Sequence, residues 1–351
     1  MRSVLAVDGG NSKTDVAIVS DDGRLLAAVR GGTSSHQAVG LGDGMERLAG
    51  LVAEAFAGAG LDGRPDLAVY TLAGADTRAD VRALSTTLEE RGFAGEQVVL
   101  NDAFGALRAG TDRSWGVVVI CGQGVNAAGV APDGRSIRLD ALGAISGDWG
   151  GGTDVGWQGL AAAVRARDGR GPRTRLERDV PAAFGLRSPA AVTSAMYTGR
   201  IAERRIGELA PVVFAAAGAG DAAARRIVDR LADEIVTMAG AMIRRLHLTR
   251  LDPEVVLAGG VFRTKDSDFR ERIVAGVRGV APRATVVGLA APPVAGAALI
   301  GLDRLAGSAV GGSLANGLRA AIGRWDAATQ RSVSGPPARK RSSSARSGKP
   351  A

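Results

Sequence analysis

Cysteine, histidine and aromatic residues are scarce in this sequence. Its 351 residues include one cysteine, Cys121, and two histidines, and only 4% of them are aromatic. One thiol cannot form a disulfide within the chain, nor supply the several thiolates that cysteine-based zinc and iron–sulfur sites require. A disulfide scaffold and a cysteine-ligated cluster held by this chain alone are therefore excluded, and a reducing, cytoplasmic compartment is expected.

Long apolar runs are also missing. The N-terminus passes from one arginine through a short apolar run to Asp8, unlike a signal peptide, and no stretch reaches the roughly 18 apolar residues of a membrane span. The sequence is 46% hydrophobic and contains 51 glycines. This composition is typical of α/β proteins, and the length is sufficient for two domains. We therefore expect two domains and no contact with a membrane.

Positive charge is concentrated at the C-terminus. The formal net charge is +8, and residues 331–351 contain six Lys or Arg residues and no acidic residue. This segment is rich in Ser, Pro and Arg without periodicity, which predicts a disordered basic tail over residues 330–351. The rest of the chain is nearly neutral, so we expect no specific nucleic-acid partner. Weak binding of the tail to RNA or to an acidic partner stays open.

Hydrophobic periodicity predicts an α/β protein whose strands form two clusters with helices between them. Strands are expected at about residues 3–8, 14–20, 24–30, 67–72, 97–101, 116–121, 125–131, 135–139, 254–258 and 284–289. Helices are expected at about residues 42–58, 78–91, 103–110, 153–168, 188–197, 201–218, 221–247, 267–279 and 293–306.

One strand–loop–strand unit occurs twice. The stretch VLAVDGGNSKTDVAIVSDDG begins at Val4, and VVVICGQGVNAAGVAPDG begins at Val117. Both pass from an apolar strand through a glycine loop to a second strand and an Asp-Gly turn. The loops begin at Gly9 and Gly122, an offset of 113 residues. An internal duplication of a β-hairpin unit is the simplest explanation.

These glycine loops are suited to holding phosphate. A tight hairpin turn needs only Asn-Gly or Asp-Gly, whereas Gly9 to Thr14 adds hydroxyls and a lysine. Backbone N–H groups without a neighbouring Cβ can cradle an anion. A third glycine pair, Gly259-Gly260 in VVLAGGVF, would let a flat ring such as adenine lie against the backbone. A single pair usually marks an ordinary turn, but the three together predict a nucleotide site.

The motifs VDGGNSKTD, NDAFGA, ICGQGVN, SGDWGGGTD and LAGGVF, in this order, resemble the N-acetylglucosamine kinase branch of the sugar-kinase, heat-shock-protein 70 and actin superfamily. This branch shares a family with the BadF/BadG/BcrA/BcrD ATPases. The resemblance covers about residues 3–306. It implies an α/β fold of two ribonuclease-H-like, actin-like ATPase domains with a nucleotide cleft between them. The domains would span 1–110, with helix 293–306 returning to it, and 111–292, with a helical insertion.

The resemblance also implies cofactors and roles at matching positions. The cofactors would be ATP and Mg²⁺, and Asp8 would hold the metal through water. Gln123 stands where the family commonly has threonine, and it still supplies a donor. The ATP-binding residues would be Gly9, Gly10, Asn11, Ser12, Lys13, Thr14, Gly122, Gln123, Gly124, Ala217, Gly259 and Gly260.

For the sugar, Asp102 in NDAFGA matches the general base, and Asn101 beside it could orient it. Phosphoryl transfer to a hydroxyl needs such a carboxylate to accept the alcohol proton. The expected acceptor is the 6-hydroxyl of N-acetylglucosamine or glucosamine. The expected substrate contacts are Ser35, His36, Asp102, Val125, Asn126 and Asp148.

Several alternatives stay open at this point. The family has a Gly-Trp pair where this chain has Ala141-Leu142, so the N-acetyl pocket can differ and another amino sugar can be the substrate. Asp148 could instead be a helix N-terminal acid, and His36 or Lys13 an ordinary exposed side chain. A non-kinase ATPase that activates a partner enzyme is the main rival function. A homodimer also stays open.

A dinucleotide-binding fingerprint is the weakest alternative. Gly122, Gly124 and Ala127 match G-x-G-x-x-A, but that motif must open a helix, whereas the residues that follow predict a strand. No Walker-type G-x-x-x-x-G-K-[ST] motif occurs in the sequence.

Overall fold

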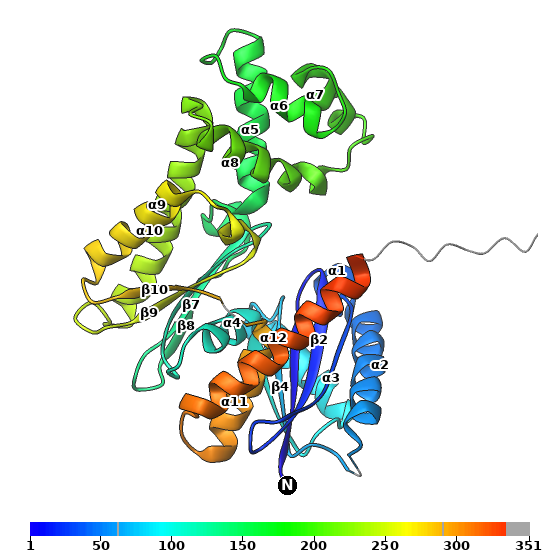
Figure 1. The fold of residues 1–351 in the computed structure, drawn as a ribbon. Coiled ribbons are helices and arrows are strands. Elements are labelled where there is room, and N and C mark those ends of the chain that lie inside the picture. Colours follow the sequence, from blue (N-terminus) through cyan, green and yellow to red (C-terminus); the bar gives the residue numbers. More distant parts are fainter. Residues whose placement is uncertain (62, 290, 335–351) are drawn as a thin grey trace, which may run out of the picture.

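The computed structural model describes residues 1–61, 63–289 and 291–334. Its strands form two five-stranded mixed sheets, each covered by helices (Figure 1). The first sheet has the order β3-β2-β1-β4-β5, and the second has the order β10-β9-β6-β7-β8. The first comprises β1 (Ser3–Gly9), β2 (Lys13–Ser20), β3 (Leu25–Gly32), β4 (Leu67–Leu72) and β5 (Glu96–Asn101); the second comprises β6 (Gly116–Cys121), β7 (Val125–Val130), β8 (Ser136–Arg138), β9 (Glu254–Ala258) and β10 (Thr285–Gly288).

The two sheets share one topology. Strand β1 pairs antiparallel with β2 and parallel with β4. Strand β6 likewise pairs antiparallel with β7 and parallel with β9. The hairpin repeat expected from the sequence is therefore present, and the repetition extends to all five strands of each sheet.

Helices cover both faces of the first sheet. One face packs on α2 (Leu41–Ala59) and α3 (Arg78–Arg91). The other packs on α11 (Pro293–Ala306) and α12 (Gly312–Ser334), which come from the end of the chain. Alternating strand residues point to opposite faces, so a sheet buried on both sides needs continuous apolar strands, and the central β1 is buried at every position.

Helix α4 (Asp102–Gly110) joins the two sheets. It packs against α11 on one side and against β6 and β7 of the second sheet on the other. Its approach to α11 requires glycine, because a Cβ on Gly296 would lie 1.8 Å from the carbonyl oxygen of Gly105. The first residue of α4 is thereby held where the two sheets meet.

The opposite face of the second sheet is covered by helices that form the largest apolar core. These elements lie between β7 and β10 in the chain. They are α5 (Gly151–Arg167), α6 (Leu176–Ala183), α7 (Pro189–Tyr197), η2 (Glu203–Leu209), α8 (Ala210–Gly218), α9 (Ala222–Arg245), η3 (Gly260–Arg263) and α10 (Ser267–Val280). The short η1 (Gly143–Ser146) precedes α5 and has no buried residue. Among the described residues no single helix is long and apolar enough to span a membrane; only Glu203–Gly218 with Ala222–Arg245, bent by 114°, meets those criteria as a pair.

All ten predicted strands are present, and each predicted helix has a counterpart. The prediction of one helix over 201–218 was wrong, because η2 and α8 divide that segment before Pro211. Helices α1 (His36–Val39), α6 and α12 were not anticipated.

Helix α12 also corrects the predicted tail. It continues to Ser334, so residues 330–334 are helical where disorder was expected. Its buried Ala315, Leu318 and Ile322 pack against the first sheet, and this tertiary contact supports the helix. Glycines at three positions of α12 had weakened its apolar pattern. The remainder of the expected tail, 335–351, lies outside the described residues.

Candidate active site

The first glycine loop is a closed turn between β1 and β2. The N–H of Gly10 donates to the carbonyl oxygen of Lys13 at 2.9 Å, and the hydroxyl of Thr33 donates to the carbonyl oxygen of Gly10 at 2.8 Å. A Cβ on Gly9 would lie 2.6 Å from a methyl group of Leu72, so a larger residue here would require that side chain to shift. The loop's next residues, Asn11 and Ser12, are exposed and available to a ligand.

The other two polar residues of this loop, Thr14 and Lys13, contact other groups of the protein. The hydroxyls of Thr14 and Ser34 are 2.8 Å apart, and both residues are buried. The Lys13 ammonium contacts the carboxylate of Asp15 and is partly exposed. Lys13 is therefore paired with Asp15 and only partly solvated.

Asp8, at the end of β1, carries a strongly perturbed carboxyl group. Only 8% of the residue is exposed. Its pKa is raised to about 8, mainly by burial and also by the nearby carboxylates of Asp15 and Asp102, against the opposing charges of Lys13 and Arg30. A buried carboxyl among other carboxylates is stabilised in its charged form by a cation. The described residues contain no group of three or more His, Cys, Asp or Glu side chains that could hold a metal, so Mg²⁺ at Asp8 would be held by this carboxylate and by water.

Asp102 is the first residue of α4 and directly follows β5. Burial raises the pKa of its carboxyl group to about 6, and Asp76 acts in the same direction. The N–H of Ala103 and the guanidinium of Arg138 oppose this shift. A carboxylate with this pKa is mostly ionised at neutral pH and is a stronger base than an exposed aspartate.

Asn101 does not orient Asp102 in the way suggested by their adjacency. Its side-chain oxygen Oδ1 caps α4 by accepting from the backbone N–H of Ala103 at 3.1 Å, and it also accepts from the side-chain amide of Asn126 at 3.2 Å. Its own amide donates to Asp76 at 3.0 Å. Asn101 therefore fixes the start of α4 and links the first sheet to β7.

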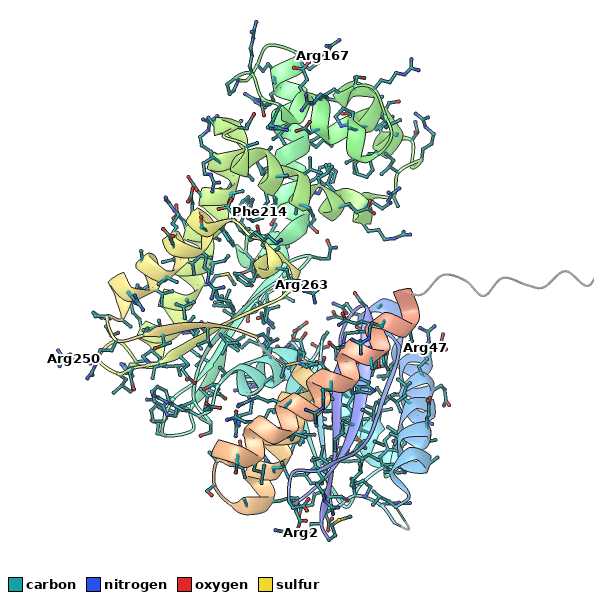
Figure 2. The ribbon with its side chains drawn as sticks, in the orientation of Figure 1. Arg2, Arg47, Arg167, Phe214, Arg250 and Arg263 are labelled. Carbon is teal, nitrogen blue, oxygen red and sulfur yellow. The ribbon has the colours of Figure 1, made fainter. Side chains whose placement is uncertain are left out.

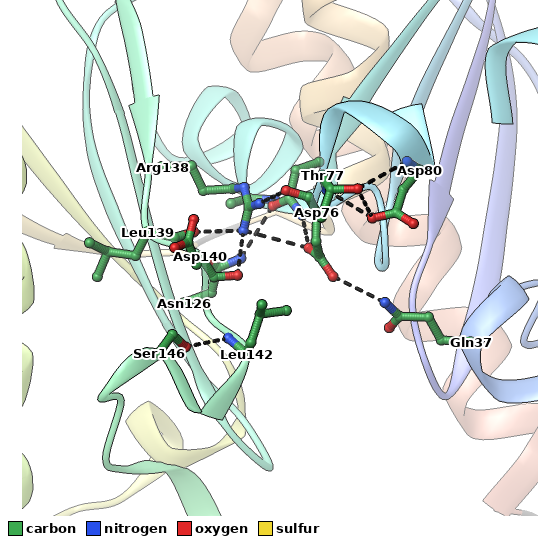
Figure 3. Close-up of polar contacts among 12 residues, drawn as sticks. Gln37, Asp76, Thr77, Asp80, Asn126, Arg138, Leu139, Asp140, Leu142 and Ser146 are labelled. Atoms are coloured by element: carbon green, nitrogen blue, oxygen red, sulfur yellow. Dashed lines mark hydrogen bonds and ion pairs between the residues drawn. The ribbon is translucent and has the colours of Figure 1, made fainter. Parts of the chain in front are cut away.

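A second polar bridge runs beside the first (Figure 3). Arg138 of β8 donates to the backbone oxygen of Asp76, which follows β4, and lies 3.5 Å from its carboxylate. Gln37 donates to the other carboxylate oxygen of Asp76 at 3.2 Å. Asp76 and Arg138 were not anticipated as site residues. Asp76 lies shortly after the buried strand β4, much as Asp102 follows β5, and this position in the sequence could have marked Asp76 as a candidate site residue.

Two buried polar atoms in this region have no partner within the described chain: Oγ of Ser35 and Oδ1 of Asn126. Buried polar atoms are nearly always paired, so each points to a group that the protein itself does not supply. Both residues had been expected to contact the sugar.

The other expected sugar contacts lie in different settings. His36 opens the short helix α1, 3.8 Å from the carboxylate of Asp80. Asp148 accepts a 2.5 Å hydrogen bond from Ser146. It is not the helix cap considered above, because Asp154 accepts from the N–H of Gly150 at 2.8 Å. Val125 begins β7, one residue before Asn126.

A cavity of about 710 Å³ lies against the second glycine loop. Figure 2 shows Phe214 of α8 and Arg263 of η3, which both line it. Gly122, Gln123 and Gly260 line it as well, so two of the three predicted glycine elements meet here. The additional lining residues, which sequence reasoning missed, are Gly152, Gly207, Ala210, Pro211, Phe214, Ala215, Gly218, Val261, Arg263, Thr264, Lys265 and Asp266.

The remaining predicted nucleotide contacts lie around this cavity. Ala217 is buried and faces a neighbouring cavity that shares Lys265 and Asp266 with the first. Gly259 packs closely against the backbone just before the second loop, since a Cβ there would lie 2.3 Å from the carbonyl oxygen of Cys121. Gly124 closes that loop by accepting from the N–H of Gly122 at 2.9 Å.

Comparison with known proteins identifies the family. Residues 5–301 match the BadF/BadG/BcrA/BcrD ATPase family, and the chain belongs to it. It is 31% identical to the N-acetylmuramic acid/N-acetylglucosamine kinase of Clostridium acetobutylicum over 74% of this chain and 86% of that protein. It is 26% identical to the N-acetyl-D-glucosamine kinase of Dictyostelium discoideum over 85% of this chain and 97% of that protein.

The fold agrees with these matches. A solved structure from Chromobacterium violaceum, described as a proposed N-acetylglucosamine kinase, aligns with a TM-score of 0.66 at 24% identity. The alignment covers 86% of this chain and 99% of that one. At this identity the likeness establishes the fold alone, an α/β arrangement with two mixed sheets.

Proposed function

We propose that this member of the BadF/BadG/BcrA/BcrD ATPase family is an ATP-dependent sugar kinase that phosphorylates the 6-hydroxyl of an amino sugar, N-acetylglucosamine or glucosamine. The observation that carries the proposal is that Asp102, at the start of α4, and Asp8, at the end of β1, are close enough for the Asp102 carboxylate to help raise the pKa of Asp8. This proximity brings a candidate base for a hydroxyl next to the acid of the first glycine loop. The curated relatives, both named as kinases of N-acetyl sugars, support the same activity.

In the proposed reaction, Asp102 accepts the proton of the attacking hydroxyl. Its raised pKa, about 6, suits this role because the carboxylate is ionised at neutral pH yet basic enough to take a proton. As the first residue of α4, Asp102 lies where the two sheets meet. Mg²⁺ near Asp8 would neutralise charge on the ATP phosphates.

The sugar would occupy the region between Asp102 and the two unpartnered atoms. Oγ of Ser35 can donate to or accept from a sugar hydroxyl, and Oδ1 of Asn126 can accept from a hydroxyl or an amine. Asp148 would accept from further hydroxyls. The adenosine would enter the cavity beside Phe214, with its phosphates extending toward Gly122 and the first loop.

The test is a coupled assay of ADP release with glucosamine, N-acetylglucosamine, N-acetylmuramic acid and glucose. We expect the highest turnover with an amino sugar or its N-acetyl derivative. A turnover of glucose tenfold higher than that of every amino sugar would contradict the proposed substrate class. ATP hydrolysis that no sugar stimulates would favour the rival function, a nucleotide-driven activator of a partner enzyme.

A further inference from the structure

A chain of charged side chains connects α12 to the first glycine loop. Asp326 of α12 contacts Arg30 of β3 at 2.6 Å. Arg30 donates to both carboxylate oxygens of Asp15 in β2, at 2.6 and 2.7 Å. Asp15 in turn contacts the ammonium of Lys13 in the loop. Trp325, next to Asp326, lies under the guanidinium of Arg30 with 5.1 Å between the charge centre and the ring.

Asp15 is the central member of this chain. Its side chain is fully buried, whereas those of Arg30 and Asp326 are 15% and 20% exposed. It also lies directly opposite Asp8 in the β1–β2 pairing. A buried carboxylate beside another acid needs a fixed counter-charge, and the bidentate contact from Arg30 supplies one.

Arg30 therefore affects how strongly Asp15 holds Lys13. With Arg30 in place, Asp15 is largely neutralised, and the Lys13 ammonium can transfer from Asp15 to an incoming phosphate. Without Arg30, Asp15 would bind Lys13 more tightly and would present an uncompensated negative charge beside the loop. Both effects would oppose phosphate binding.

We propose that Asp15, Arg30 and Asp326 are positioning residues that hold Lys13 ready for the nucleotide phosphates, and that α12 thereby forms part of the nucleotide site. This inference rests on the proposed function, because it assumes that the first loop binds nucleotide phosphates. It assigns a role to a helix and to two charged residues, Arg30 and Asp326, that lie outside the sequence motifs.

Calorimetric titration of the full-length chain with the non-hydrolysable analogue AMP-PNP and Mg²⁺ tests the proposal. Arg30→Gln is expected to weaken analogue binding about tenfold. Asp326→Asn is expected to weaken it about threefold, a smaller effect because the contact between Arg30 and Asp326 is partly exposed. Arg30→Lys should recover part of the affinity, since it restores the charge but not the two-pronged contact. Affinity for N-acetylglucosamine should remain unchanged in all three.

A double-mutant cycle separates positioning from general damage. If Arg30 acts largely through Lys13, then Arg30→Gln introduced into Lys13→Met should weaken AMP-PNP binding by no more than about threefold further, since only the uncompensated charge of Asp15 then remains. Simple destabilisation would instead add its full effect in both backgrounds.

Asp112→Asn is the matched control, because it removes a different ion pair of the same helix. Arg319 of α12 pairs with Asp112 at 2.5 Å, at the connection between α4 and β6 and not at the loop. Its loss should leave AMP-PNP affinity unchanged. Equal losses for Asp112→Asn and Asp326→Asn, or normal affinity in Arg30→Gln, would overturn the proposal. Failure of the unmodified chain to bind AMP-PNP would instead overturn the proposed function.

Discussion

The two glycine loops occupy the same place in two sheets of the same strand order, yet their surroundings differ. The first loop lies among charged groups, where Asp8 faces Asp15 and Lys13 contacts Asp15. The second lies against backbone: a Cβ on Gly151 would be 2.4 Å from the carbonyl oxygen of Gln123.

This difference shows that a shared backbone frame does not determine the chemistry of its loops. Charged side chains around the first loop can bind metal and phosphate and can respond to pH. Close backbone packing around the second loop shapes a cavity and tolerates little change in volume. The predictions below test this division, beginning with the largest expected effect.

Replacing Asp102 with Asn should lower turnover by about 10²- to 10⁴-fold, because the amide keeps the shape of the side chain but cannot accept the proton. Nucleotide affinity should change little, since the cavity is lined by other residues. Turnover and AMP-PNP affinity measured side by side provide the check. Asp133→Asn, in the exposed β7–β8 turn, is the control, and an equal loss there would mean that the base is misassigned.

Replacing Gly259 with Ala should destabilise the second sheet. The residue has φ +109°, and the added Cβ would lie 2.3 Å from the Cys121 carbonyl oxygen. We expect the free energy of unfolding to fall by about 2 to 4 kcal/mol, measured by thermal or denaturant unfolding.

Gly10→Ala in the first loop sharpens this comparison. Its Cβ would come no closer than 3.4 Å to the Lys13 carbonyl oxygen. We therefore expect a change in melting temperature of less than about 2 °C. Similar losses of stability in the two variants would show that the loops are packed alike.

Turnover should depend on the ionisation of Asp102. Burial raises the pKa of this carboxyl group to about 6, and the base must be ionised, so turnover should fall as the pH drops through about 6. At pH 5 it should be about tenfold below its plateau at saturating substrate. A turnover that stays constant down to pH 4.5 would argue against a buried carboxylate base.

Asp8→Asn should raise stability while it removes activity. Burial raises the folded-state pKa of Asp8 to about 8, above the ordinary value of 3.8. The folded protein then retains a proton that the unfolded chain releases, so this group makes stability decline as pH rises from about 4 to 8. In metal-free buffer, the melting temperature of Asp8→Asn should exceed that of the unmodified chain by about 2 °C or more at pH 8.

At pH 4 the two proteins should differ much less, by about 1 °C, because the pH is then close to the ordinary pKa of 3.8 and the unfolded chain gains little free energy by releasing the proton of Asp8. An equal difference at pH 4 and pH 8 would show that packing, and not the charge of Asp8, produces the effect.

Local patterns were sufficient for much of the fold. Apolar strands ending in glycine loops predicted both hairpins and their repetition, because strand alternation and turn chemistry act between near neighbours in the chain. The acid after β5 was likewise recognisable as a candidate base. These features depend on a few adjacent residues and need no knowledge of distant segments.

Tertiary structure alone decided the rest. Helix α12 depends on burial against the first sheet, and the contact between Arg30 and Asp326 joins residues 296 positions apart. The cavity wall beside Phe214 and the meeting of Asp76 with Arg138 likewise require elements from separate parts of the chain. Periodicity shows which face of an element is apolar, but which distant partner covers it depends on the packing of the whole chain.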